Sequence, residues 1–109
     1  MLSAYRVLDL TDEQGFYCGQ LFGYLGADVI KVEKLGGDES RYIPPFINGT
    51  VNPENSLYWH SFNTNKRGIT LNLEKEDGRR IFKQLSAKAD VVVESARPGR
   101  MSELGLDYT

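Results

Sequence analysis

The chain has 109 residues, of which 13 are basic and 15 acidic, so its formal net charge is −2. Hydrophobic residues make up 40% and charged residues 26%, a globular composition that excludes a disordered polar chain, a collagen and a disulfide scaffold. The slight acidic excess argues against a general nucleic-acid binder, whose domain usually carries excess basic charge.

The N-terminal third predicts a strand, a helix and a second strand. Residues 5–10 form an aliphatic run typical of a strand, and cap-type residues at 11–13 are placed to open a helix. Side chains at helical spacing mark one face of this helix up to Gly26, namely Phe16, Gln20, Leu21, Tyr24 and Leu25. Residues 28–33 are typical of a second strand. The series therefore predicts a βαβ unit with parallel strands and a right-handed crossover.

Residues 34–57 interrupt this rhythm and predict one long loop. Turn signals crowd into it at Gly36-Gly37-Asp38, Pro44-Pro45, Asn48-Gly49 and Asn52-Pro53. A loop of this length inside a compact domain is usually functional or disordered. Its apolar residues indicate that it packs against another part of the molecule; they are Tyr42, Ile43, Phe46 and Ile47.

The α/β rhythm resumes after an aromatic segment at residues 58–62. Residues 68–73 alternate apolar and polar, which predicts a strand, and residues 76–87 have the spacing of an amphipathic helix. Residues 90–94 form an apolar strand of the kind buried on both sides. A turn at 97–99 then precedes the start of a last helix. We expect one α/β domain over residues 1–109, with an open, mostly parallel sheet.

Ligands of such sheets bind beyond the carboxyl ends of the strands, near helix N-termini. Three segments are predicted to lie there, at residues 11–15, 34–41 and 95–100, and two of them are rich in Lys and Arg. Lys34 and Arg41 flank a Gly-Gly-Asp turn and either hold a phosphate or are ordinary surface charges.

Two further basic segments carry the same pair of alternatives. Arg97 and Arg100 follow an apolar strand, so their planar guanidinium groups either recognise phosphate or lie exposed around a capping turn. Lys66 and Arg67 follow a polar turn and either meet an anion or face water. Residues 51–109 hold nine basic and eight acidic groups, which is compatible with one local anionic ligand.

Several other chemistries are disfavoured. The G-x-G-x-x-G fingerprint is absent, and Asp12 and Glu13 lie where a pyrophosphate would bind. One cysteine and one histidine exclude a Cys/His zinc site, and no metal is expected. Cys18 is predicted to be a buried structural thiol and His60 a packing residue. Trp59 and its aromatic neighbours are predicted to anchor the core.

The chain also carries no targeting signal that we recognise. Acidic residues at positions 9, 12 and 13 interrupt the N-terminal apolar stretch, so no signal peptide is predicted. No apolar run is as long as a membrane-spanning helix, which needs about 18 residues or more. A lone cysteine cannot form an internal disulfide and fits a reducing compartment. We therefore expect a soluble, cytoplasmic protein with neither membrane nor nucleic-acid partners.

Seven short motifs are spread over most of the chain. They are RVLDLT at 6–11, LGADVIKVE at 25–33, GDESR at 37–41, NTNKRGITLNL at 63–73, ADVVVE at 89–94, RPG at 97–99 and LGL at 104–106. In this order and near this spacing, the motifs resemble family III CoA-transferases, the group of formyl-CoA and carnitine CoA-transferases and α-methylacyl-CoA racemases. Members are several times longer than this chain. The resemblance implies the N-terminal part of a larger Rossmann-like domain, with the family's catalytic aspartate beyond Thr109.

The resemblance also implies where coenzyme A (CoA) binds. Gln14 and Gly15 match a loop near the pantetheine and the thioester, and Lys34 matches a basic residue that pairs with a CoA phosphate. Leu71 and the following residues from Asn72 to Glu74 match a segment beside the adenosine. With the residue-based candidates above, the predicted CoA-binding set is Gln14, Gly15, Lys34, Arg41, Leu71, Asn72, Ser95, Ala96, Arg97 and Arg100.

Two positions, one in this set and one close to it in the sequence, depart from the family's pattern. Many members place an aromatic residue at the position of Ala96, so a stacking face for adenine is missing here. Glu103 matches a position that is often an arginine in contact with phosphate, which reverses the charge. We expect Arg100, one helical turn earlier, to compensate.

The function that the resemblance implies is transfer of CoA between carboxylic acids through covalent aspartyl intermediates. Acyl-CoA and a carboxylic acid are then the substrates, and the full-length family forms interlocked homodimers. With no catalytic residue of its own, this chain alone is expected to be inactive. The alternatives are an acyl-CoA racemase of the same family, a non-catalytic α/β binding or interaction module, and an unrelated Rossmann-like nucleotide binder.

Overall fold

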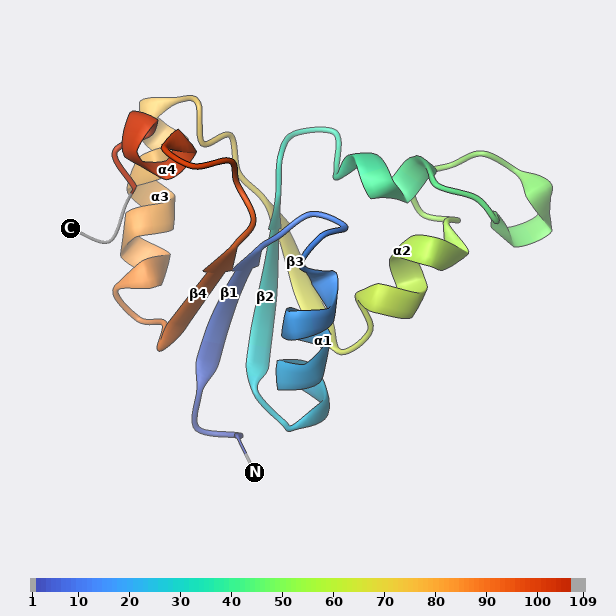
Figure 1. Ribbon diagram of the computed structural model, residues 1–109, viewed down its shortest axis with the longest axis horizontal. Helices are drawn as coiled ribbons and strands as arrows, with labels where there is room; N and C mark the ends of the chain where they lie inside the picture. Colours follow the sequence, from blue (N-terminus) through green and yellow to red (C-terminus); the bar gives the residue numbers. More distant parts are fainter. Residues whose placement is uncertain (1, 107–109) are drawn as a thin grey trace.

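A parallel sheet flanked by helices organises residues 2–106, the part of the chain that the computed structural model describes (Figure 1). The strands are β1 (Arg6–Leu10), β2 (Asp28–Glu33), β3 (Lys66–Thr70) and β4 (Val91–Glu94). They run in the order β3-β2-β1-β4, and every neighbouring pair is parallel. The predicted α/β class with an open, mostly parallel sheet is confirmed. All four carboxyl ends therefore meet at one edge, at the top of Figure 1.

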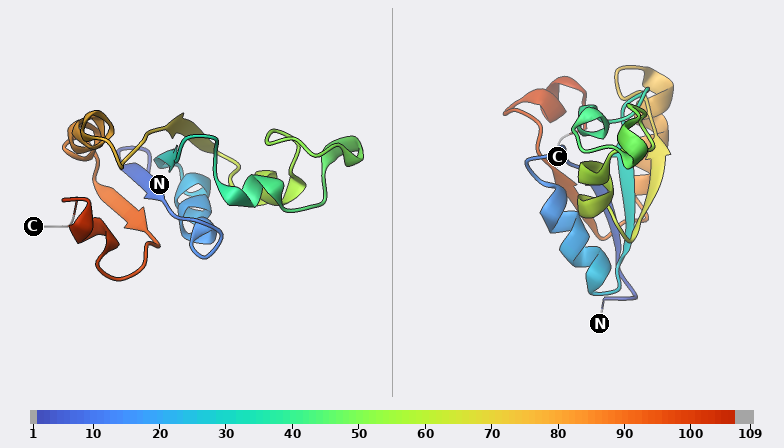
Figure 2. Two further views of the ribbon diagram at one scale, coloured as in Figure 1. Left: turned by 90° about the horizontal axis from the view of Figure 1, so that it is seen from above. Right: turned by 90° about the vertical axis from the view of Figure 1, so that its right-hand side faces the viewer.

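Two helices cover opposite faces of this sheet, α1 (Phe16–Tyr24) on one side and α3 (Glu76–Ser86) on the other (Figure 2). Successive residues of a strand point to opposite faces. Val7 accordingly joins an apolar cluster with Val29 and the half-buried Phe22 of α1, whereas Leu8 joins Ile30 and Phe82 of α3. The alternation in β1 thus supplies both halves of the core.

The helix after β1 begins later than predicted. Residues 11–15 form a loop and α1 starts at Phe16, because the Asp12 carboxylate accepts a hydrogen bond from the Gln14 N–H within the loop instead of capping a helix there. Cys18 is exposed, so the prediction of a buried thiol is wrong. The buried residues of α1 are Phe16, Gly19 and Gln20, which places Cys18 on the helix face turned to solvent.

The third and fourth strands also differ from prediction. Strand β3 begins at Lys66, two residues before the predicted start, because its ladder already opens where Lys66 faces Val29. Strand β4 is not buried on both sides: Val91 and Val93 pack toward the sheet's α1 side, but Val92 is 42% exposed. Within residues 2–106, β4 is an edge strand and α3 packs over its neighbours, so Val92 has no cover.

The segment from 34 to 57 projects from the sheet, to the right in Figure 1, and holds two short 3₁₀ helices, η1 (Glu39–Tyr42) and η2 (Ile47–Gly49). Helix α2 (Leu57–Phe62) follows it and carries the buried Trp59, whose ring meets Phe16 edge-to-face at 5.4 Å. The prediction that Trp59 anchors the core is therefore confirmed. Of the four apolar residues that were predicted to pack, Ile43 and Phe46 are half-buried, whereas Tyr42 and Ile47 stay exposed.

The C-terminal part of the described chain returns to the carboxyl edge of the sheet. Gly99 has a φ of 86°, a left-handed conformation that suits glycine, and the short helix α4 (Arg100–Glu103) starts directly after it. This helix agrees with the predicted start of a last helix. No helix within residues 2–106 has the length and apolar character needed to cross a membrane.

Candidate functional site

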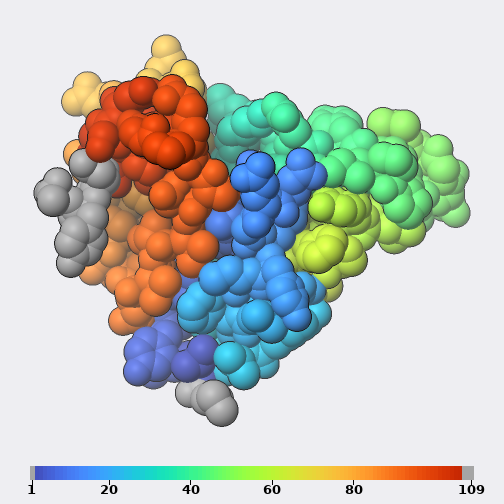
Figure 3. Space-filling model, viewed as in Figure 1, coloured from blue at the N-terminus to red at the C-terminus, as the bar shows by residue number. Residues whose placement is uncertain are grey.

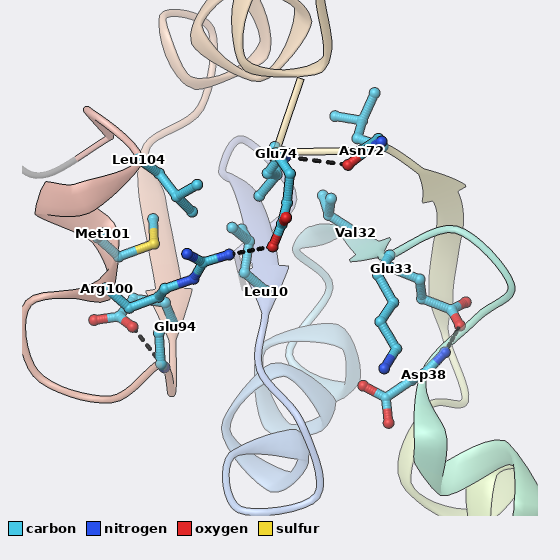
Figure 4. A pocket seen from close by; sticks show the side chains of 14 residues that line it. Leu10, Val32, Glu33, Asp38, Asn72, Glu74, Glu94, Arg100, Met101 and Leu104 are labelled. Atoms are coloured by element: carbon cyan, nitrogen blue, oxygen red, sulfur yellow. Dashed lines mark hydrogen bonds and ion pairs between the residues drawn. The ribbon is translucent and has the colours of Figure 1, made fainter. Parts of the chain in front are cut away.

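A cavity of about 300 Å³ opens at the carboxyl edge of the sheet, between the segment after β3 and helix α4 (Figure 4). The ends of β1 and β2 contribute Leu10 and Val32 to its wall, and α4 and the residue after it contribute Met101 and Leu104. Carboxylates and cations surround these apolar groups. The cavity thus combines an apolar wall with charged groups at its rim.

Five of the ten residues predicted to bind CoA line this cavity. They are Lys34, Leu71, Asn72, Ala96 and Arg100. They come from the segments after β2, β3 and β4, which lie far apart in the sequence and meet because parallel strands end at one edge. The structure therefore brings the basic residue after β2 and the basic residue of α4 to the same opening.

The wall formed by residues 71–74 is held from two sides. The Leu71 N–H donates to the Glu33 carbonyl at 2.9 Å, which continues the β2–β3 pairing beyond the strand. Behind it, Gly78 of α3 lies so close to the Asn72 carbonyl that a Cβ at residue 78 would overlap with that oxygen. Helix α3 thus sets the position of Asn72 in the cavity wall.

Arg100 lies across the cavity mouth and forms an ion pair with Glu74 at 2.5 Å, as Figure 4 shows. Glu103 lies 3.7 Å from Arg100 and 3.0 Å from Arg97. On the opposite rim, Lys34 pairs with the exposed Glu39 at 2.9 Å, and this hydrogen bond raises the pKa of Lys34. Exposed pairs of this kind are worth little, so an anionic ligand can displace the carboxylates at small cost.

Arg41 lies outside the cavity, and its guanidinium group is engaged within the fold. Its Nε and Nη2 each donate to the Glu33 carboxylate at 2.7 Å, and its Nη1 donates to the Pro53 carbonyl at 2.9 Å. The guanidinium also stacks 4.1 Å from the Trp59 ring centre. Burial alone would raise the pKa of Glu33, but the hydrogen bonds and charge of Arg41 outweigh burial, so the pKa of Glu33 lies below its ordinary value. Arg41 thereby fastens the projecting segment to β2.

The loop at 11–15 lies next to the segment after β4, as the blue and orange-red surfaces in Figure 3 show. The Asp12 N–H donates to the Ser95 hydroxyl oxygen at 2.9 Å, and that hydroxyl donates to the Asp12 carboxylate at 2.9 Å. Gln14 and Gly15 belong to this loop. They, Ser95 and Arg97 do not line the cavity, but all lie along the same edge of the sheet.

The sequence does not predict the cavity role of Met101 and Leu104 or the burial of Lys66. Met101 and Leu104 line the cavity, although their spacing indicates only the apolar side of a short helix. The side chain of Lys66 is buried beneath the first turn of α1, although a basic residue after a polar turn gives no sign of burial. Among residues 2–106, no three His, Cys, Asp or Glu side chains are arranged to hold a metal ion.

Comparison with known proteins gives a consistent result over the whole chain. Residues 2–109 match the family model described as CoA-transferase family III. The subunit BbsE of succinyl-CoA:(R)-benzylsuccinate CoA-transferase from Thauera aromatica is 43% identical over 106 residues, which cover 97% of this chain and 26% of that protein. The succinyl-CoA:glutarate CoA-transferase of Mus musculus is 44% identical over 110 residues, covering 98% of this chain and 24% of that protein.

Solved structures agree with this result. A CAIB/BAIF family protein from Brucella suis superimposes with a TM-score of 0.87 at 41% identity, over 97% of this chain and 28% of that one. Rv3272 from Mycobacterium tuberculosis gives a TM-score of 0.85 at 37% identity, over 97% of this chain and 28% of its own. The chain thus spans about a quarter of the length of the relatives that it matches.

Proposed function

The chain belongs to CoA-transferase family III, and from this premise we propose that it supplies the acyl-CoA-binding surface of an enzyme that moves CoA between carboxylic acids. The observation that carries the proposal is the cavity at the carboxyl edge of the sheet. Its apolar wall suits an adenosine, and a cation at each side suits the phosphates of CoA.

Each part of the cavity then has a role. Leu71 and Asn72 lie beside the adenosine, and Met101 and Leu104 face them across the opening. Ala96 offers no aromatic face, so the base is held by aliphatic contacts and not by stacking. Arg100 exchanges Glu74 for a phosphate of CoA, and Lys34 exchanges Glu39 in the same way. Gln14 and Gly15 then lie toward the thioester end.

The carboxylate that receives the acyl group belongs, in our proposal, to a part of the enzyme outside this chain. Asp9 is fully buried and paired with two lysines, and the Asp38 side chain accepts a hydrogen bond from the Ser40 N–H at 2.9 Å. Asp9 is therefore closed off from a bound thioester, and Asp38, which lines the cavity, is engaged by Ser40 through one carboxylate oxygen. In the reaction that the family resemblance implies, a carboxylate oxygen attacks the thioester carbonyl, the C–S bond breaks, and CoA leaves as a thiolate while an acyl anhydride forms.

The relatives also suggest the acyl donor. The similar proteins from Thauera aromatica and Mus musculus carry succinyl-CoA in their names. We therefore propose succinyl-CoA as the donor and a dicarboxylic acid, or another carboxylic acid of similar size, as the acceptor. The assembly follows the family resemblance, as an interlocked homodimer of the complete gene product in the cytoplasm.

A transfer assay tests this function. The complete gene product that carries this chain is incubated with succinyl-CoA and a panel of carboxylic acids, and new CoA thioesters are followed by mass spectrometry. We expect one acceptor or a few to gain CoA, with release of succinate. Formation of no new thioester would contradict the proposal, as would epimerisation of a 2-methylacyl-CoA as the sole reaction or a preference for NAD or ATP over CoA in calorimetry.

A further inference from the structure

Three charged side chains are buried together beneath the loop at 11–15. Asp9 is 0% exposed, and the side chains of Lys31 and Lys66 are 2% and 1% exposed. Lys66 Nζ lies 2.6 Å from Asp9 Oδ2, and Lys31 Nζ lies 3.5 Å from Asp9 Oδ1. One carboxylate therefore lies between two ammonium groups, each on a different strand of the sheet.

The two ammonium groups use their other hydrogens on the ends of the loop. Lys31 Nζ donates to the Thr11 carbonyl at the loop's start. Lys66 Nζ donates to the Phe16 carbonyl, directly after the loop, at 3.2 Å. Asp9 Oδ1 accepts from the Thr11 N–H at 2.9 Å and from the Thr11 hydroxyl at 2.5 Å. The cluster thus attaches both ends of the loop to the sheet.

Neither lysine is available to bind a ligand. The third contact of Lys66 Nζ is the Asn63 amide oxygen at 2.9 Å, and the Phe16 ring centre lies 4.6 Å from Lys31 Nζ and 5.4 Å from Lys66 Nζ. Helix α1 closes the site from above, because Gly19 packs against Asp9 so tightly that a Cβ at residue 19 would overlap with Oδ2. The cluster therefore acts on the backbone that surrounds it.

Stability alone does not account for this arrangement. Moving each ion out of water costs several kcal/mol, and apolar replacements of buried ion pairs are often neutral or stabilising. Burial lowers the pKa of Lys31, and the nearby Asp9 only partly offsets this effect. Yet the loop that the cluster holds is itself exposed at residues 12–14 and has little packing of its own. The contacts of Lys31 and Lys66 with the backbone of Thr11 and Phe16 therefore hold the loop in place.

We propose that Lys31 and Lys66 are positioning residues, which hold the loop at 11–15 so that Gln14 and Gly15 face the thioester end of bound acyl-CoA. This inference rests on the proposed function. The lysines lie outside the cavity lining. Their loss consequently shifts the reacting end of the substrate while the adenosine and phosphate contacts stay in place. Binding of CoA is then preserved and the rate of transfer falls.

The test uses Lys31→Met and Lys66→Met in the complete gene product, since methionine keeps an unbranched stem but removes the ammonium group. Thr11→Val is a milder third variant, which deletes one hydroxyl bond to Asp9 at nearly constant volume. Phe82→Leu is the control for a general loss of stability, because Phe82 belongs to the core on the opposite face of the sheet and does not line the cavity.

Two readouts separate positioning from a general loss of stability. Hydrogen–deuterium exchange of a peptide covering 11–16 is expected to rise about tenfold in the lysine variants, whereas peptides of β2 and α3 exchange as in the parent. The kcat for transfer from succinyl-CoA is expected to fall about tenfold or more while the Kd for CoA changes by less than about threefold. Thr11→Val gives the same pattern at smaller size, and Phe82→Leu gives neither change.

Unchanged exchange at 11–16 in all three variants would overturn the proposal. So would a fall in kcat that Phe82→Leu reproduces, or a loss of CoA affinity as large as the loss of kcat. If the parent protein binds no CoA, the proposed function fails. The exchange measurement then still decides, in the absence of any substrate, whether the lysines hold the loop.

Discussion

Arg100 and Glu74 illustrate how one ion pair can both shape and close a binding site. The pair joins α4 to the segment after β3 across the cavity mouth, and the Arg100 side chain is 33% exposed. Because the guanidinium group has to leave Glu74 to meet a phosphate, the carboxylate competes with the ligand. Exposed pairs are worth about 0.2–1 kcal/mol, which sets the scale of this competition.

Replacing Arg100 by alanine should weaken CoA binding. A charge-assisted bond to phosphate is worth about 1.5 kcal/mol, so we expect a loss of about tenfold in affinity. Titration calorimetry of Arg100→Ala measures it, with Arg80→Ala on the outer side of α3 as a control of equal charge change. Equal affinities for the two variants would show that Arg100 does not contact the ligand.

Replacing Glu74 by glutamine should have the opposite effect. The change removes the competing carboxylate, and we expect CoA affinity to rise by about two- to fivefold, the worth of an exposed pair. Glu76→Gln, in the first turn of α3, removes the same charge away from the cavity and should leave the affinity unchanged. Weaker binding by Glu74→Gln would mean that Glu74 itself contacts the substrate.

The pKa values of two buried carboxylates predict how stability depends on pH. Burial alone would raise the pKa of Asp9 and of Glu33. The lysines beside Asp9 and the Arg41 guanidinium beside Glu33 outweigh this effect, so both pKa values are lowered. Each carboxylate is thus more acidic in the folded than in the unfolded state. It contributes stability above its ordinary pKa, near 3.8 for Asp9 and 4.5 for Glu33, and this stability is lost as the pH falls below these values.

Urea unfolding of the parent between pH 7 and pH 3 should therefore show a falling free energy of unfolding at the acidic end. In Arg41→Met, Glu33 keeps its burial but loses its partner, so its pKa in the folded state rises. The free energy of unfolding at pH 7 should therefore be lower than in the parent, and less of it should be lost as the pH falls toward 3. Arg80→Met is the control of equal charge change. A pH profile for Arg41→Met that parallels the parent would contradict the role assigned to this pair.

At the scale of elements, the position of α3 determines the geometry of the cavity wall. Gly78 leaves no room for a side chain against the Asn72 carbonyl, so Gly78→Ala has to push the helix and the 71–74 segment apart. We expect a loss of about 1–3 kcal/mol in stability, the usual cost of overpacking, together with weaker CoA binding.

Gly68→Ala provides the matched comparison, because a Cβ there meets no atom within 4 Å. It should leave both stability and CoA affinity near the parent values. Thermal unfolding and calorimetry of the two variants compare them directly. If Gly78→Ala were as harmless as Gly68→Ala, helix α3 would not control the wall.

The sequence predicts some helices and strands of this fold well and others poorly. Hydrophobic patterning places β1, β2 and α3, because each buries the apolar residues that its period indicates. It misplaces the start of β3, where Lys66 and Arg67 look like a solvated turn. Lys66 turns inward to Asp9, a long-range pairing that no local pattern encodes. Of the two basic residues that were predicted to meet a phosphate after β2, Lys34 lies at the edge of the cavity, whereas Arg41 turns away to Glu33.

At the scale of the whole molecule, several apolar surfaces lie open. On α1, Tyr17, Leu21 and Tyr24 are each between 45% and 58% exposed, and Val92 on the edge strand is 42% exposed. The apolar run of β4 is typical of a strand that is buried on both faces, yet within residues 2–106 the face that carries Val92 is left uncovered. Since the relatives are about four times longer, we expect these surfaces to be covered in the complete assembly.

A crystal structure of the complete gene product with bound CoA would show whether the cavity at the carboxyl edge of the sheet holds the ligand. We expect the adenosine against Leu71 and Asn72, with a phosphate within hydrogen-bond distance of Arg100 and the Glu74 carboxylate displaced. CoA bound elsewhere, with the Arg100–Glu74 ion pair intact and the cavity filled by solvent, would contradict it.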